Sequence, residues 1–211
     1  MLKSKLDVKI LGKVKYFLGV NFESINNVTY LSQYSYINKL MKKFNELPKS
    51  YVNLPFKVGL KLPLGEKDSK IEETELMQKF PYRTLLGCLS FIASRTRPDI
   101  EYAVNTMSQF NNCYTKAHWD IVVNIFNYVC NTKDHKINLT KTDDSGLVAF
   151  SDANWGSDLT FRHSTGGYLI MFCGVPKIYQ TEDDCPELHG GGVRCTHRLC
   201  KRTFMVFKYY L

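Results

Sequence analysis

An aspartate at the end of an apolar stretch is the residue of this chain with the clearest potential for metal chemistry. Residues 147–151 have the composition of a strand, and Asp152 follows them directly, with Asp158 in the polar segment beyond. A cluster of carboxylates can hold two divalent ions, one that activates water and one that stabilises a leaving oxygen. A single aspartate beside serine and glycine is more often a turn former, so the residues alone favour a structural role for Asp152.

A second group of possible ligands lies in the last part of the chain. Its cysteines and histidines are of the types that bind zinc, and three consecutive glycines among them are compatible with a flexible or phosphate-binding loop. These residues are Cys185, His189, Gly190, Gly191, Gly192, Cys195, His197 and Cys200. Their spacing does not closely match a standard zinc finger, so the pattern is only a weak indication of a metal site.

The charge of the chain favours a polyanionic partner. The formal net charge is +8, the isoelectric point is about 9.0, and residues 1–50 contain nine lysines and three acidic residues. Lysine and arginine bind nucleic acids by neutralising phosphates and releasing counterions. A soluble basic protein without such a partner explains the charge equally well, so a specific contact must be argued from particular side chains.

Composition also bears on location and on other partners. No apolar run approaches the roughly 20 residues of a membrane span, and residues 1–5 lack the apolar core of a signal peptide. Seven cysteines are an odd number, and the scattered Cys88, Cys113 and Cys130 favour free buried thiols over a disulfide framework. We therefore expect an intracellular protein, in the cytoplasm or nucleus, without a membrane partner. The sequence specifies no protein partner.

The elements that position these residues begin with a hairpin. Residues 14–22 and 28–31 are strand-forming, and Asn26 and Asn27 between them can adopt the positive φ of a tight turn. Ser32 is expected to cap a helix that ends before Pro48. Apolar residues recur in this helix at intervals of three and four, at Ile37, Leu40, Met41, Phe44 and Leu47.

The other faces of this helix are expected to be polar, and the residues that follow it, up to residue 73, are expected to lack regular structure. Three lysines fall on other helix faces, Lys39, Lys42 and Lys43, and solvated charges explain them more simply than a phosphate track. Prolines and glycines between residues 48 and 73 predict an extended, mobile connector. From about residue 74 to 132, apolar residues recur in three helical stripes, which predicts three packed helices.

Two motifs of the helical block are best explained by structure. In Thr96-Arg97-Pro98-Asp99, Thr96 and Asp99 have the spacing of a helix cap, and Pro98 is tolerated in a first helical turn. His118-Trp119 is typical of a helix entrance with a buried indole, because no second ligand or nucleophile lies near His118 in the sequence.

The order and spacing of six motifs resemble those of copia-type retrotransposon Pol polyproteins, over roughly residues 1–179. Residues 147–168 resemble the start of a ribonuclease H domain. The other motifs are Tyr16-Phe17-Leu18-Gly19, Leu31-Ser32-Gln33, Tyr82-Arg83-Thr84-Leu85-Leu86-Gly87, Thr96-Arg97-Pro98-Asp99-Ile100 and His118-Trp119. The resemblance implies the end of a reverse transcriptase followed by ribonuclease H. The parent enzyme would be an RNA-directed DNA polymerase with ribonuclease H activity that uses magnesium.

The resemblance implies roles for particular residues. Asp152 matches the first ribonuclease H metal ligand of the family. The hairpin resembles the primer grip, so an RNA or DNA primer–template would contact it and the next helix, weakly and without sequence preference. The residues expected to bind nucleic acid are Lys13, Lys15, Tyr16, Phe17, Leu18, Gly19, Lys42 and Lys43. Residues 124–128 depart from the family, which tends to place basic residues among the apolar ones there.

Two catalytic motifs of the family are missing. The Tyr-x-Asp-Asp pair precedes the hairpin in the family, and Asp143-Asp144 lies instead in a polar turn. The second ribonuclease H carboxylate belongs to a Ser-Ser-Thr-Glu-Ala-Glu-Tyr segment, where this chain has residues 180–194. Permissible codons for those residues, when read one nucleotide later, encode Lys-Arg-Lys-Thr-Ile-Ala-Leu-Ser-Ser-Thr-Glu-Ala-Glu-Tyr. Residues 180–211 are therefore predicted to be an out-of-frame tail whose zinc-like pattern is accidental, and we expect no tightly bound magnesium.

These observations predict an α+β fold in five segments. Residues 1–47 are expected to form the end of the palm, with a primer-grip-like hairpin and the first thumb-like helix, and residues 48–73 an extended connector. Residues 74–140 are expected to form a thumb- or connection-like helical bundle. Residues 141–179 would hold the first antiparallel strands of an incomplete ribonuclease H-like domain, and residues 180–211 the tail. We expect a Pol polyprotein remnant that is catalytically inactive alone. A non-catalytic nucleic-acid-binding module and a protein-interaction or effector protein derived from a transposon fragment are the alternatives.

Overall fold

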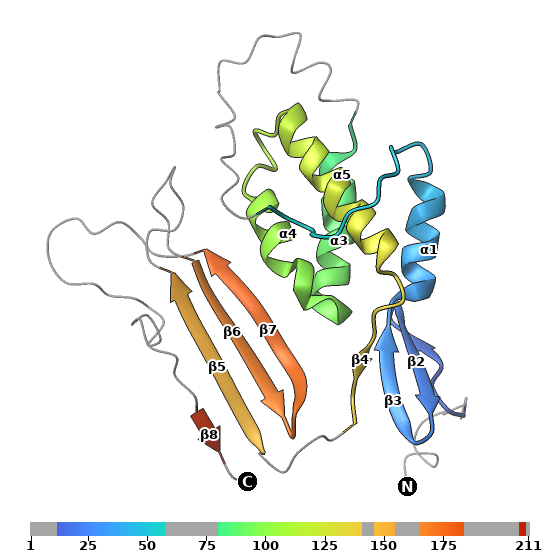
Figure 1. Ribbon diagram of the computed structural model, residues 1–211, viewed down its shortest axis with the longest axis vertical. Helices are drawn as coiled ribbons and strands as arrows, with labels where there is room; N and C mark the ends of the chain where they lie inside the picture. Colours follow the sequence, from blue (N-terminus) through green and yellow to red (C-terminus); the bar gives the residue numbers. More distant parts are fainter. Residues whose placement is uncertain (1–11, 58–79, 141–145, 155–164, 184–206, 210–211) are drawn as a thin grey trace, which may run out of the picture.

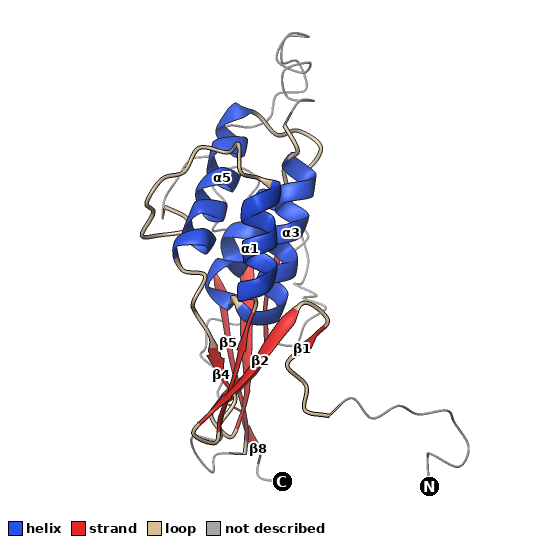
Figure 2. Cartoon of the chain, turned by 90° about the vertical axis from the view of Figure 1, so that its right-hand side faces the viewer, coloured by secondary structure: helices blue, strands red, loops and turns tan. Residues whose placement is uncertain are grey.

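Helices gather at one end of the molecule and strands at the other. The computed structural model describes residues 12–57, 80–140, 146–154, 165–183 and 207–209. Figure 2 shows the strands extending away from the helical end, and the same two groups are labelled in Figure 1. Four α-helices and two four-stranded antiparallel sheets are present among the described residues, which confirms the predicted α+β class.

The first sheet has the strand order β1-β2-β3-β4 and contains two tight turns where one was predicted. β2 (Val20–Ile25) and β3 (Val28–Ser32) are joined through Asn26 and Asn27, whose φ angles of 49° and 63° confirm the predicted turn. The strand predicted over residues 14–22 is interrupted, because Leu18 and Gly19 also have positive φ. β1 (Tyr16–Phe17) therefore folds back on β2, with Phe17 opposite Val20.

The first helix, α1 (Tyr34–Lys43), begins without the predicted cap. Ser32 is buried in β3, and Gln33 occupies the cap position without a side-chain cap hydrogen bond. The Asn21 side chain of β2 binds the first turn instead. Its Oδ1 accepts a hydrogen bond from the Ser35 backbone N–H at 3.2 Å, and its Nδ2 donates to Ser35 Oγ at 2.9 Å. The predicted apolar stripe is confirmed, with Ile37, Leu40 and Phe44 buried.

Three further helices complete the core, as predicted for residues 74–132. They are α3 (Tyr82–Thr96), α4 (Glu101–Ser108) and α5 (Lys116–Asn131), and a 3₁₀ turn, η1 (Pro98–Ile100), leads into α4. Apolar side chains from all three helices and η1 meet α1 in one cluster. Its fully buried members include Leu85, Leu89, Ile92, Ile100, Met107, Val122, Ile125 and Val129. Burial of these side chains supplies the main stabilising free energy of the helical end.

The chain returns to the first sheet after α5, which the sequence did not indicate. β4 (Ile137–Asn138) pairs antiparallel with β3, with Ile137 opposite Leu31. An ion pair between Lys136 and Glu23 of β2 accompanies this pairing. The short strand therefore ties the end of the helical bundle to the hairpin.

The second sheet contains the strands predicted for the start of a ribonuclease H-like domain and continues beyond them. β5 (Leu147–Asn154) and β6 (Thr165–Phe172) pair antiparallel, as expected. β6 then pairs with β7 (Val175–Asp183), which extends past the predicted tail boundary at residue 180. β8 (Phe207–Tyr209) pairs with β5 at the opposite edge. Residues 184–206 and 210–211 of the predicted tail lie outside the described residues.

Three smaller predictions concern the connector, the cysteines and membrane spans. Residues 48–57 form no helix or strand, and the rest of the predicted connector lies outside the described residues. The described cysteines, Cys88, Cys113, Cys130 and Cys173, form no disulfide, although Cys113 is exposed rather than buried as expected. No helix in the described part of the chain is long and apolar enough to cross a membrane.

Candidate nucleic-acid interface

The turn between β1 and β2 lies against the side of α3. Gly19 has a φ of +82°, and a Cβ added there would lie 2.8 Å from Cζ of Phe91, a distance that real Cβ contacts essentially never show. A side chain at this position would require the Phe91 ring to shift, and the positive φ independently favours glycine. Its neighbour Leu18 has a φ of 47°, a conformation that costs a leucine about 1–2 kcal/mol. The structure thus keeps a strained leucine at the tip of the turn.

The three apolar residues of this turn are exposed. The exposed fractions are 47% for Tyr16, 58% for Phe17 and 66% for Leu18. We call these three residues the turn surface. Large exposed apolar side chains at neighbouring positions can mark a contact site.

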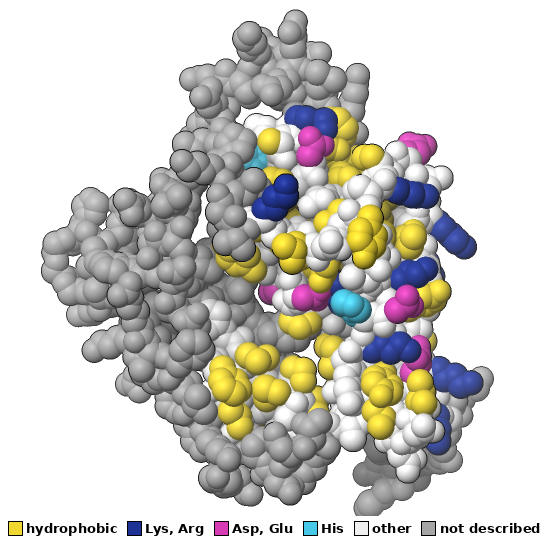
Figure 3. Space-filling view, viewed as in Figure 1, with side chains coloured by type: hydrophobic (Ala, Val, Ile, Leu, Met, Phe, Trp, Pro, Cys, Tyr) yellow, Lys and Arg dark blue, Asp and Glu magenta, His cyan; other side chains and the backbone are white. Residues whose placement is uncertain are grey.

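A lysine of α1 lies over an aromatic ring of the turn surface. Nζ of Lys39, in α1, lies 5.9 Å from the centre of the Tyr16 ring, within cation–π range. Lys42 and Lys43 are three and four residues further on, so they lie on the same side of α1 as Lys39. With the exposed Lys13 and Lys15 before β1, they form a set that we call the basic strip: Lys13, Lys15, Lys39, Lys42 and Lys43. Figure 3 shows lysine and arginine side chains along the edge of the molecule that carries α1 and the hairpin.

Aromatic and cationic groups continue from the turn onto α3. The rings of Phe91 and Tyr36 pack edge to face with centres 5.0 Å apart, and the Arg95 guanidinium lies 5.8 Å from the Phe91 ring centre. Burial, together with a hydrogen bond to Cys88, raises the pKa of Tyr36 to about 12, so this phenol stays protonated. Arg95 was not among the predicted binding residues, because its proximity to the turn depends on the packing of Phe91 under Gly19.

The Thr96–Ile100 motif is an ion-pair network rather than the predicted cap. Arg97 is 2% exposed and binds Asp99 with two hydrogen bonds, of 2.9 Å from Nε and 2.7 Å from Nη2. It also donates to the Thr132 carbonyl oxygen at the end of α5 at 3.0 Å. The Thr96 hydroxyl donates instead to the side-chain oxygen of Gln33 at 2.8 Å, so it does not cap the turn that contains Asp99. Pro98 does occupy the first turn of η1, as predicted.

The electrostatics of Asp99 follow from this network. Burial alone would raise the pKa of its carboxyl, but the hydrogen bonds and positive charge of Arg97 outweigh burial and lower the pKa below its usual value. The Tyr128 hydroxyl also donates to Asp99, at 2.9 Å. The motif therefore joins α3, α4 and α5, and its charges are used within the fold.

His118 and Trp119 form the predicted helix entrance. Nδ1 of His118 accepts a hydrogen bond from the Thr115 backbone N–H at 3.0 Å and completes a capping box at the start of α5. The Trp119 indole is buried and stacks on Phe80, with ring centres 5.1 Å apart. A structural role for this motif is confirmed.

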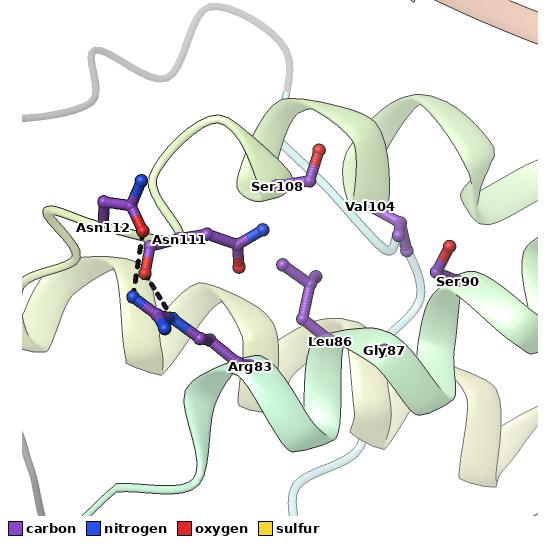
Figure 4. Close-up of a pocket in the computed structure, with 8 residues that line it drawn as sticks. All are labelled: Arg83, Leu86, Gly87, Ser90, Val104, Ser108, Asn111 and Asn112. Atoms are coloured by element: carbon purple, nitrogen blue, oxygen red, sulfur yellow. Dashed lines mark hydrogen bonds between the residues drawn. The ribbon is translucent and has the colours of Figure 1, made fainter.

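A groove of about 510 Å³ lies between α3 and α4 (Figure 4). Buried Leu86 and Val104 line it, and Arg83 lies at one end. The Arg83 guanidinium donates to the Asn111 carbonyl oxygen at 2.8 Å and to Asn112 Oδ1 at 2.9 Å. Two of its donors are therefore used to fix the loop that follows α4.

Comparison with known proteins identifies the family. No family model and no solved structure matches the chain. It is 34% identical, over 86% of its length, to the retrovirus-related Pol polyprotein from transposon RE2 of Arabidopsis thaliana, and 32% identical, over 86%, to that from transposon TNT 1-94 of Nicotiana tabacum. The chain belongs to the retrovirus-related Pol polyproteins of transposons. It spans 12% and 14% of the length of those two polyproteins.

A different kind of protein shares part of this Pol chain. Secreted RxLR effector protein 161 of Plasmopara viticola is 33% identical over 98 residues, which are 46% of this chain and 69% of that protein. The shared sequence therefore occurs outside full-length polyproteins.

The predicted nucleic-acid-binding residues of the Pol chain are exposed, except for Gly19, which is half-buried against Phe91. Lys13 and Lys15 precede the turn surface in the sequence, and Lys39 contacts Tyr16 from α1, the helix that ends in Lys42 and Lys43. Sequence reasoning assigned Lys39 to a solvated face. The spacing of three residues between Lys39 and Lys42 could have indicated that Lys39 shares a helix face with a predicted binding residue. Its contact with Tyr16 depends on the folded hairpin and is not visible in the sequence.

The predicted metal ligand of the Pol chain is described at the backbone only. Asp152 lies in β5 opposite Gly167 of β6, which agrees with the expected pair of strands. Its side chain, Asp158, the Asp143-Asp144 turn and the Cys185–Cys200 pattern lie outside the described residues. In the described part of the chain, no group of three or more His, Cys, Asp or Glu side chains is arranged to hold a metal ion.

The segment that departs from the family has a structural use. Asn127 of α5 is buried, and its amide donates to the Pro48 carbonyl oxygen at 2.9 Å and to Ser50 Oγ at 3.0 Å. Asn131 donates to the Ser50 carbonyl oxygen at 3.2 Å. The start of the connector is thereby held on α5 by amides.

Proposed function

We propose that this segment of a retrotransposon Pol polyprotein contacts nucleic acid by charge, without sequence preference and without catalysing a reaction by itself. The contact between Lys39 and Tyr16 carries the proposal, because it joins the lysines before β1 to those of α1 in one basic strip. Five exposed lysines on these two segments favour a polymer of phosphates, whose condensed counterions they release on binding. The ligand would be RNA or DNA, including a primer–template.

The subdomain assignment supports this proposal and is itself a proposal. The β1–β3 region would correspond to the primer grip, α1 and α3–α5 to a thumb- or connection-like bundle, and β5–β7 to the first strands of ribonuclease H. The order of the six sequence motifs supports the assignment, and so does the family of the chain.

Salt dependence is the test of the proposed binding. We expect the affinity for a labelled DNA duplex to fall as salt rises, with a slope of log affinity against log salt of about −2 to −4, since each duplex phosphate contact contributes about −0.9. Fluorescence anisotropy across a salt series measures this slope. A duplex of scrambled sequence should bind equally well. Binding that does not weaken as salt rises would contradict the proposal.

The reactions of the parent polyprotein would need catalytic groups that the described residues of this chain do not supply. The sequence contains no Tyr-x-Asp-Asp pair, and the described residues do not fit a two-metal site. The shifted reading of residues 180–194 supports the proposal that the chain from about residue 180 is out of frame.

The tail proposal makes a prediction about cleavage. With magnesium or manganese, the chain should not cut an RNA–DNA hybrid, and Asp152→Asn should change nothing, because a lone carboxylate holds magnesium too loosely. A gene restored to the other frame and extended through the domain should gain cleavage that Asp152→Asn abolishes. A gel assay of labelled hybrid measures both. Metal-dependent cleavage by the 211-residue chain that Asp152→Asn removes would refute the proposal.

A protein-interaction or effector role is the second candidate. The observation that favours it is the similarity to secreted RxLR effector protein 161, of which this chain matches 69%. The helical bundle would provide the contact surface. A pulldown with the whole chain, in high salt and after nuclease treatment, tests this role, because a partner retained under both conditions does not depend on bound nucleic acid.

A further inference from the structure

The turn surface has a property that phosphate binding does not require. Phosphates are bound by lysine ammonium groups, yet Tyr16, Phe17 and Leu18 expose apolar side chains beside the basic strip. Exposed apolar area costs free energy in water, and Leu18 adds the cost of a left-handed backbone. A ligand that contacts this turn must therefore offer both negative charge and apolar faces.

We infer that the turn surface binds the unpaired bases of single-stranded nucleic acid by stacking, while the basic strip holds the backbone phosphates. This inference rests on the proposed function and specifies its ligand. Single-stranded nucleic acid combines a polyanionic backbone with accessible π-faces, and proteins bind it with positively charged grooves and aromatic side chains. The cation–π contact of Lys39 with Tyr16 places the two kinds of group side by side.

The geometry of the turn favours a single strand over a duplex. Tyr16 and Phe17 are consecutive in β1, so their rings point to opposite sides of the strand. A duplex keeps its bases stacked inside and presents a rigid row of phosphates. A single strand is flexible between nucleotides and can place successive bases on rings that face in different directions.

Charge complementarity argues against a purely apolar occupant. A protein partner held by apolar contact alone would gain nothing from Lys39 beside Tyr16 or from the other exposed lysines of the basic strip. A phosphatidylserine bilayer would use both the lysines and the apolar tip, but it requires no aromatic ring at position 17. Replacement of Phe17 by an aliphatic residue therefore separates stacking from insertion.

The experiment compares the affinities of the whole chain for two ligands that share one strand, of which the duplex has the higher charge density, so that charge alone would favour the duplex. One is a labelled oligothymidylate of about 20 nucleotides, and the other is the same strand paired with oligodeoxyadenylate. We expect tighter binding to the single strand. Phe17→Ala should weaken it about tenfold and change duplex binding less than about twofold, since a stacked base contributes on the order of a fivefold to hundredfold affinity.

Three variants act as controls. Tyr51 is 84% exposed and lies outside the turn, so Tyr51→Ala should leave both affinities unchanged. Phe17→Trp should retain single-strand affinity, and Phe17→Leu should lose it. Full single-strand affinity of Phe17→Leu would overturn the inference, and so would binding to phosphatidylserine vesicles that Phe17→Ala abolishes while oligothymidylate binding persists.

Failure of the inference can be distinguished from failure of the proposed function. Equal, salt-dependent affinity for single strand and duplex would overturn stacking and leave charge-based binding intact. Absence of salt-dependent binding to either ligand would overturn both.

Discussion

Replacement of Arg97 by alanine should lower the free energy of unfolding by about 3 kcal/mol. Arg97 is 2% exposed, and its guanidinium binds both carboxylate oxygens of Asp99. Removal of one partner from a buried ion pair costs about 3–5 kcal/mol, because the other charge is left uncompensated. The Asp99 side chain is 35% exposed and can recover some hydration, so the lower end of this range applies. Urea unfolding followed by circular dichroism measures the change.

Two variants test whether the loss comes from this network. Arg97→Lys keeps the charge but cannot bind both oxygens of Asp99 and the Thr132 carbonyl in one plane, so it should destabilise less than alanine. Asp120→Asn breaks an exposed ion pair with Lys116, in which both side chains are 58% exposed. That control should cost no more than about 0.5 kcal/mol. Equal losses of unfolding free energy for Arg97→Ala and Asp120→Asn would show that the buried network stabilises the fold no more than an exposed ion pair does.

Acid gives an independent measure of the same ion pair. The pKa of Asp99 is lowered in the folded chain, so its contribution to stability is fully present above the unfolded pKa of about 4 and disappears as pH falls through the lower folded value. The wild-type chain should therefore lose stability below about pH 4. Arg97→Ala should lose less over that range, because the carboxyl has already lost the cation that lowers its pKa.

Local patterns were sufficient to predict the helices and one of the two tight turns. Asn26 and Asn27 tolerate positive φ, and the structure has it at both residues. Leu18 does not normally adopt this conformation, so the residues before β2 resembled an uninterrupted strand. The turn places Gly19 against the Phe91 ring, a contact across more than 70 residues of sequence that a local pattern does not contain.

Partners that are distant in sequence also explain the errors at Ser32 and Thr96. Both residue types commonly cap helices, and each precedes a helical segment. In the structure, Asn21 of a neighbouring strand binds the first turn of α1, and Thr96 binds Gln33. The residues of the candidate interface were predicted from motifs, but their grouping was not. Lys39 joins them only because the hairpin folds back onto α1.

Reversal of two charges on α1 should have the largest effect on binding. Lys42→Glu combined with Lys43→Glu should weaken DNA duplex binding roughly thirtyfold at 0.15 M salt, because two phosphate contacts of slope about 0.9 contribute about 1.5 log units at that concentration. The magnitude of the salt slope should fall by about 2. Both lysines are exposed near the end of α1, so the fold should be retained. Anisotropy titrations at several salt concentrations measure affinity and slope together.

The matched control changes the same net charge elsewhere. Lys57 follows Phe56, whose ring contacts Tyr102 of α4, and Lys116 begins α5, so neither belongs to the basic strip. Lys57→Glu combined with Lys116→Glu should therefore leave the salt slope nearly unchanged, with a small loss of affinity from net charge alone. If both double variants lose affinity and slope equally, the chain binds through its overall charge. If only Lys42→Glu with Lys43→Glu loses slope, the phosphates lie along α1, because counterions are released only where phosphates and lysines are in contact.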